Sequence, residues 1–153
     1  MNWSAIGAIG EILGALAVFV SLIYLGAQIR ANTRQSKAAM ASGVTVEQSR
    51  LLESLGRPDL AEIAVKILTG AEMSDEQHFR WHTHLARTAH VYAAIQTAHE
   101  NGQIDDGFYA DCQEQLKMFM NILPSARKDL KSIVAGNHPS IGESGVFRSV
   151  FAD

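Results

Sequence analysis

Five histidines within residues 74–100 are the side chains of this sequence best suited to hold a metal ion. Two of them, His78 and His82, are four residues apart, so on a helix they would share one face and could chelate Zn²⁺ or another transition metal. Zinc takes three or four ligands, and Phe79 excludes an HExxH motif, so further ligands would have to come from a later segment. We therefore predict that the protein has no metal site. His78 and His82 are the weak candidate ligands. The histidines are His78, His82, His84, His90 and His99, and the later side chains are Asp111, Cys112 and Glu114.

Patterns typical of catalysis are missing from the sequence. A serine nucleophile of the hydrolase type sits on a sharp turn that reads G-x-S-x-G, and no such motif occurs. The stretch from Gly142 to Gly145 lacks the lysine and the preceding strand of a phosphate-binding loop. We therefore predict that the protein is not an enzyme, and that it has no catalytic residue and no cofactor.

The most informative stretch runs from Trp3 to Ile29 and contains one charged residue, Glu11. As a helix it would cover roughly 40 Å, which exceeds the ~30 Å of bilayer hydrocarbon. Residues 12–27 contain no ionisable side chain except Tyr24, which argues against a helix that lies on the membrane surface. The stretch is therefore predicted to be a transmembrane anchor.

Small residues form a stripe along this predicted span. Steps of three and four residues keep them on one helical face, where they let a second backbone approach closely, as in GxxxG helix pairs. We predict that spans associate through this stripe, with Glu11 beside it. The stripe consists of Gly7, Gly10, Gly14, Ala17 and Ser21.

Glu11 is the polar group that the span has to accommodate. A carboxylate inside the apolar segment costs a few kcal/mol on insertion scales, so Glu11 is neutral, is paired, or faces a protein interior. One interpretation is a functional group, which forms an interhelical hydrogen bond, lines a pore or binds a proton. The alternative is that Glu11 reaches the nearby headgroups by snorkelling.

The charges that flank the span predict its orientation. Arg30, Arg34 and Lys37 follow it with no acid before Glu47, whereas only the amino group of the chain precedes it. The positive-inside rule then places the C-terminal side in the cytoplasm and the N-terminus outside. The basic n-region of a cleaved signal peptide is missing, so we predict an uncleaved, single-pass anchor. The three basic residues are predicted to contact lipid headgroups.

Composition after the span indicates one small domain. About 120 residues remain, which is enough for a single core. The single cysteine, Cys112, fits a reducing compartment. The net charge is −3, and the sequence lacks the clustered basic residues of a nucleic-acid-binding surface. We predict an all-α fold without strands, divided into an anchor (1–29), a juxtamembrane helix (30–57) and a cytoplasmic helical domain (58–153).

Helix start and stop signals divide the domain into several predicted helices. Val44 to Leu55 carries enough apolar surface to dock on a core, and Gly56 with Pro58 is a stop signal. Ser74 opens a capping box with Gln77. The expected helices cover residues 59–68, 74–100, 106–122 and 125–134. Asp105 or Asp106 is expected to begin the third of these helices and Ser125 to cap the fourth, and Asn101-Gly102 is the expected stop of the second. A loop from Gly136 to Gly145 and a final apolar turn at 145–151 follow. The expected core arc is Trp81, Leu85, Ala89, Tyr92, Ala93, Ile95 and Gln96.

The opening resembles that of a large set of uncharacterised bacterial proteins. Their first span ends in a Y-L-x-x-Q-I-R-x-N-T signature, which here occupies residues 24–33. A short helix after a proline at Pro58, and a Gly-x-Ile-Asp-Asp turn at 102–106 followed by Phe108, are similar too. Many relatives have tryptophan near residues 127–130, and this chain does not. The resemblance implies an inner-membrane anchor with a helical cytoplasmic domain, and it brings no catalytic residue.

Two functional classes follow from these observations, and a third stays open, an enzyme that uses the histidine face or a pocket not visible in the sequence. The first is a non-enzymatic scaffold or accessory protein that forms a homo-oligomer or docks another membrane complex. The second is an oligomeric channel or proton-linked pore, in which Glu11 faces the lumen. In both classes the expected partners are the lipid bilayer and other membrane proteins, and no nucleic acid.

Overall fold

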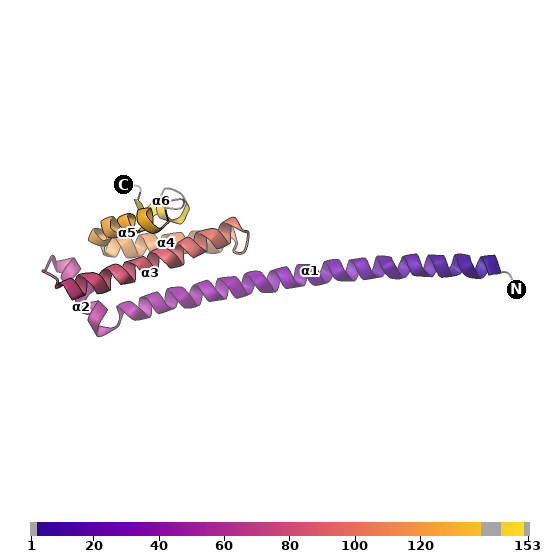
Figure 1. Ribbon diagram of the computed structural model, residues 1–153, viewed down its shortest axis with the longest axis horizontal. Helices are drawn as coiled ribbons and strands as arrows, with labels where there is room; N and C mark the ends of the chain where they lie inside the picture. Colours follow the sequence, from indigo (N-terminus) through magenta and orange to yellow (C-terminus); the bar gives the residue numbers. More distant parts are fainter. Residues whose placement is uncertain (1–2, 139–144, 152–153) are drawn as a thin grey trace. The chain divides into compact units, whose positions relative to one another are not determined.

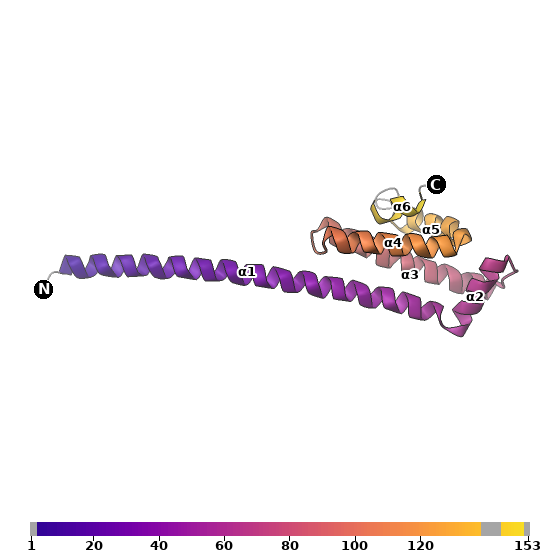
Figure 2. The ribbon, with the colours of Figure 1, turned by 180° about the vertical axis from the view of Figure 1, so that it is seen from behind.

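The computed structural model describes residues 3–138 and 145–151, and within these ranges the chain is all-α and has no strand (Figures 1 and 2). This confirms the predicted fold class. The chain divides into two compact units, Met1–Ala38 and Ala39–Asp153. The elements are α1 (Trp3–Leu55), α2 (Pro58–Thr69), α3 (Asp75–Glu100), α4 (Asp106–Ile122), α5 (Pro124–Asn137), the 3-10 helix η1 (Gly145–Phe147) and α6 (Arg148–Phe151).

Helix α1 is uninterrupted across the predicted boundary between the anchor and the juxtamembrane helix. The second unit begins at Ala39, so the last part of α1 belongs to it. The helix ends where Gly56 N–H donates to the carbonyls of Leu52 and Glu53, at 3.2 and 3.1 Å. Pro58 then opens α2, a position where its missing N–H costs nothing. The predicted stop is confirmed.

Helix α1, which begins in the first unit, is long and apolar enough from Ile6 to Leu55 to cross a membrane, by length and composition. Its most apolar window has a mean hydropathy of 2.2. Large apolar side chains are exposed along it, with Leu13 and Phe19 both at 63%. Exposed apolar side chains on every face are not the pattern of a surface helix on a soluble domain, which shows one apolar stripe.

The second unit is built around α3, which packs on α2, α4, α5 and η1. In both views α3, α4 and α5 lie side by side (Figures 1 and 2). The predicted core arc of α3 is confirmed, since every one of its members is buried, as are Val44 and Leu51 at the end of α1. These two residues are seven apart, two helical turns, so one face of α1 meets the core.

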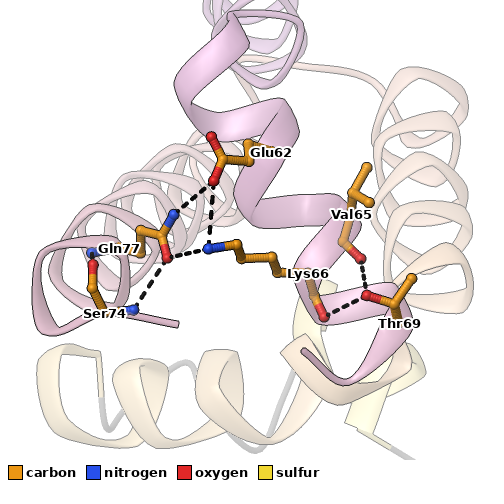
Figure 3. Close-up of polar contacts among 6 residues, drawn as sticks. All are labelled: Glu62, Val65, Lys66, Thr69, Ser74 and Gln77. Atoms are coloured by element: carbon orange, nitrogen blue, oxygen red, sulfur yellow. Dashed lines mark hydrogen bonds and ion pairs between the residues drawn. The ribbon is translucent and has the colours of Figure 1, made fainter. Parts of the chain in front are cut away.

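The capping box at the start of α3 is confirmed and also ties α3 to α2 (Figure 3). Gln77 N–H donates to Ser74 Oγ at 3.3 Å, and Ser74 N–H donates to Gln77 Oε1 at 3.1 Å. The same amide accepts from Lys66 Nζ at 3.0 Å and donates to Glu62 Oε1 at 3.1 Å. One side chain therefore closes the helix end and bridges two helices.

Other helix ends follow their signals with local differences. Gly102, with φ +65°, takes the left-handed conformation after α3, and Asp105 caps α4 by accepting from Phe108 N–H at 2.9 Å. The predicted Ser125 cap is wrong, because Pro124 already occupies the first position of α5 and no side chain caps it.

The predicted glycine-rich loop begins later than expected. Helix α5 continues through Gly136 to Asn137, three residues beyond the predicted end at Val134. Residues 139–144 of that loop lie outside the described part of the chain.

The final turns, expected from the apolar residues at 145–151, pack on the bundle. Val146, Phe147 and Val150 are at most 1% exposed. Gln96 holds the segment in place: its Oε1 accepts from Val146 N–H at 2.8 Å and also from the Tyr109 hydroxyl. A polar side chain on the buried face of α3 therefore helps to dock the C-terminal turns, together with Gln113 of α4, which donates to the carbonyl of Gly145 at 3.3 Å.

Replacing Gly145 by alanine should destabilise the second unit. Gly145 has φ +62°, and a Cβ there would overlap the side-chain amide of Gln96. We expect Gly145→Ala to lower the free energy of unfolding by about 2 kcal/mol or more. The measurement is urea unfolding followed by Trp81 fluorescence in a Trp3→Phe background.

The matched control is Gly136→Ala on α5, where a Cβ would meet nothing within 4 Å. Because alanine favours an exposed helix over glycine by about 0.5–1 kcal/mol, this variant should be as stable as the parent or more stable. Equal stabilities of the two variants would contradict the proposed role of Gly145.

Candidate functional site

A pocket of about 400 Å³ opens in the second unit, between the end of α1, the middle of α3 and the last turns of α4. Ligand pockets typically measure about 300–1,000 Å³ and are mostly apolar with a few placed polar groups. Within the described residues this pocket has that composition. Its lining comprises Thr45, Gln48, Ser49, Leu51, Leu52, Leu55, His84, Thr88, Tyr92, Gln115, Leu116, Met118, Phe119 and Ile122.

The floor of the pocket is one stripe of α3. His84, Thr88 and Tyr92 recur every fourth residue, so their side chains lie above one another on one face. All three are buried although each carries a polar group. Apolar side chains of α1 and α4 supply the walls. The lining contains no aspartate, glutamate, lysine or arginine.

His84 is held neutral by its position. Its ring stacks on Trp81 at 5.7 Å between centroids, and its Nδ1 lies 3.2 Å from Ser54 Oγ. Burial, and secondly the charge of Arg87, lower the pKa of His84 to about 4. Ser54 donates its single hydroxyl proton to the carbonyl of Leu51 at 2.7 Å, so Nδ1 is the donor to Ser54 Oγ. The other ring nitrogen, Nε2, is therefore an acceptor.

Tyr92 supplies the complementary donor. Gln48 Nε2 donates to Tyr92 Oη at 3.5 Å, the long limit of a hydrogen bond. The Tyr92 hydroxyl proton has no acceptor among the described residues. Burial raises the pKa of Tyr92 to about 12, and it also raises the pKa of the neighbouring Cys112 thiol. The pocket therefore combines a neutral donor and a neutral acceptor at neutral pH.

The predicted metal candidates lie elsewhere. His78 and His82 are exposed on α3, and Cys112 is buried. In the described ranges no group of three or more histidine, cysteine or acidic side chains is placed to hold a metal ion. One histidine contact was not foreseen: His90 Nδ1 lies 2.8 Å from His138 Nε2, across 48 residues of sequence.

The predicted association residues lie on the α1 part of the first unit and are exposed. A Cβ added at Gly7, Gly10 or Gly14 would meet nothing within 4 Å, so packing within the described chain does not require glycine there. Ser21 Oγ donates back to the carbonyl of Ala17 at 2.8 Å. Glu11, beside the stripe, is exposed as well. The predicted headgroup contacts Arg30, Arg34 and Lys37 are also exposed.

Sequence reasoning placed Tyr92 in the core but missed the pocket. A signal was present, since polar His84 and Thr88 occupy the same helical stripe as Leu85 and Ala89. Polar groups on a buried stripe need partners, and such residues often line sites. The sequence of α3 alone does not specify which other helices leave space beside these residues.

Comparisons of the chain with protein-family models, with curated proteins and with solved structures found no match. The family resemblance carried by the signature at residues 24–33 therefore stays a prediction. The candidate site is defined by the pocket geometry described above.

Protonation of His84 should make the second unit acid-sensitive. Its folded pKa, about 4, lies below the ordinary value of 6.5, so the unfolded chain binds the proton first as the pH falls. The contribution of neutral His84 is complete above pH ~6.5 and is lost toward pH ~4. We expect wild type to lose about 2 kcal/mol more stability over this window than His84→Gln.

The measurement is urea unfolding at several pH values, in the Trp3→Phe background. His82→Gln, an exposed neighbour on the same helix, is the control and should keep the wild-type pH profile. Parallel profiles for wild type and His84→Gln would show that folding does not lower the pKa of His84.

Proposed function

We propose that the protein is a membrane-anchored, non-enzymatic helical scaffold or accessory protein of the bacterial inner membrane. The observation that carries the proposal is the exposure of nearly every apolar side chain in the first unit, on a helix of sufficient length. Exposed apolar surface is unfavourable in water by ~25 cal/mol per Å². A helix satisfies its own backbone hydrogen bonds, so a bilayer accepts it.

Flanking charge supports the orientation. Arg30, Arg34 and Lys37 are exposed on the helix immediately after the apolar stretch. Anionic lipids of the cytoplasmic leaflet attract such residues by ~1 kcal/mol each. We infer that the N-terminus is outside and the helical unit is cytoplasmic. The resemblance to bacterial proteins with the same span signature supports this assignment.

Self-association of the span, or docking of another membrane complex, is the proposed molecular role. The exposed small residues from Gly7 to Ser21 support it, because no packing within the described chain accounts for them. Glu11 beside them supports a second candidate, a pore with this carboxyl group facing the lumen. The two candidates differ in what Glu11 does, and this difference is testable.

The orientation can be tested with C-terminal reporter fusions. A cytoplasmic C-terminus should make a fluorescent-protein fusion bright and an alkaline phosphatase fusion inactive, because the phosphatase needs an oxidising compartment for its disulfides. Replacing Arg30, Arg34 and Lys37 with glutamine is the control, and it should reduce the difference between the fluorescence and phosphatase signals. A dark fluorescent fusion together with an active phosphatase would contradict the proposed orientation.

The association stripe can be tested at Gly14. Isoleucine there would hold two backbones apart by the width of a branched side chain, so Gly14→Ile should reduce the oligomer strongly. Glu11→Gln should weaken it mildly, because interhelical hydrogen bonds in membranes average ~0.6 kcal/mol. Native mass spectrometry in one detergent compares these variants with wild type, and Leu13→Ile, beside the stripe, is the control.

Liposome ion flux measured alongside separates the two candidates. A scaffold should show no flux, whereas a pore should conduct and change its selectivity in Glu11→Gln while the oligomer stays whole. An oligomer that is unchanged in Gly14→Ile would show that the interface does not lie on the stripe of small residues.

A further inference from the structure

We propose that the pocket between the end of α1, α3 and α4 binds a neutral single-chain amphiphile, an apolar chain that ends in a hydroxyl or carbonyl group. The polar end would contact Tyr92 and His84, and the chain would lie between α1 and α4. This site belongs wholly to the second unit. The inference therefore does not rest on the proposed membrane anchor.

The walls of the pocket favour an apolar chain. Leu52, Met118 and Ile122 line it and yet remain 65%, 61% and 56% exposed. Exposed large apolar side chains that gather around a hollow are typical of a ligand site. An apolar chain in the hollow would remove part of their surface from water, which is the main driving force of such binding.

The absence of formal charge in the lining selects a neutral ligand. No acidic or basic side chain is among the residues that line the pocket. Arg87, whose charge acts on His84, pairs with Glu47 at 3.2 Å and is not part of the lining. A carboxylate or phosphate placed in the pocket would lose its hydration without gaining a partner.

The polar groups on the floor select a ligand with a hydrogen-bonding end. The Tyr92 hydroxyl has a proton to donate, and His84 Nε2 has a lone pair to accept with. A hydroxyl group can satisfy both, and a carbonyl can satisfy Tyr92. The apolar face of a second copy would satisfy neither, and buried polar groups without partners are unfavourable. A small amphiphile is therefore a better occupant than another protein surface.

The test uses the full chain in phosphatidylcholine vesicles at pH 8, with two photoreactive probes. One is a long-chain primary alcohol that carries a diazirine, and the other is the carboxylic acid of the same chain length, which is ionised at this pH. After irradiation, the labelled peptides are identified by mass spectrometry. We expect saturable labelling of residues 45–55 and 115–122 by the alcohol, reversed by excess unlabelled alcohol. The acid should label them at least about tenfold less.

Two variants test the assignment. Ser49→Trp, at an exposed lining position, should fill the pocket and remove this labelling, whereas Ser132→Trp, an exposed position on α5, should not. Tyr92→Phe keeps the packing and removes the donor, so the half-saturating alcohol concentration should rise about threefold to tenfold. Circular dichroism confirms that each variant is folded.

Equal labelling by the acid, unsaturable labelling, or labelling unchanged in Ser49→Trp would each overturn the proposal. A parallel sample without the alcohol is treated with a bifunctional photoreactive crosslinker, and crosslinks that join residues 45–55 of two copies would overturn the proposal in favour of a self-association surface. Labelling of residues 6–29 reports separately on insertion of the anchor. Saturable pocket labelling without it would support the ligand site and count against the anchor.

Discussion

The second unit depends on burial of one continuous face of α3. This face runs from Trp81 to Ala98 and packs on α2, α4, α5 and η1, so α3 is the helix that these four elements share. Leu85 and Ile95 are completely buried within it. Removing such side chains from water supplies most of the favourable free energy of a small domain. The face also carries Gln96, whose amide docks the C-terminal turns, so the same stripe organises both the core and its closure.

Polar groups on that face explain why a pocket exists where it does. A stripe that contained only leucine and isoleucine would be covered by closely packed neighbours. Thr88 instead donates to the carbonyl of His84 in its own helix, His84 Nδ1 bonds to Ser54 of α1, and the space above them remains open. Burial keeps His84 and Tyr92 uncharged. The hollow thus has mostly apolar walls, polar groups at its floor and no formally charged side chain in its lining, which decides the kind of molecule it can accept.

The first unit obeys a different constraint. Its residues do not form one apolar face that a bundle would cover, and its glycines have no neighbours that require them. Such a segment is stable where the surrounding medium is itself apolar, because the helix leaves no backbone group unsatisfied there. In the membrane setting proposed above, association between such helices would rely on close packing and hydrogen bonds rather than on the hydrophobic effect. The two units therefore gain stability from different physical sources, although one helix, α1, contributes to both.

The features that the sequence by itself determined are those with local causes. The capping box at Ser74, the stop at Gly56 and Pro58, and the core arc of α3 depend on residues within a few positions of one another. Only the tertiary structure decided the burial of His84, the pocket beside it and the attachment of Val146 to Gln96. These depend on which faces of helices distant in sequence meet. Helical periodicity specifies that a face is buried, but it does not specify the element that covers the face or the space left between them.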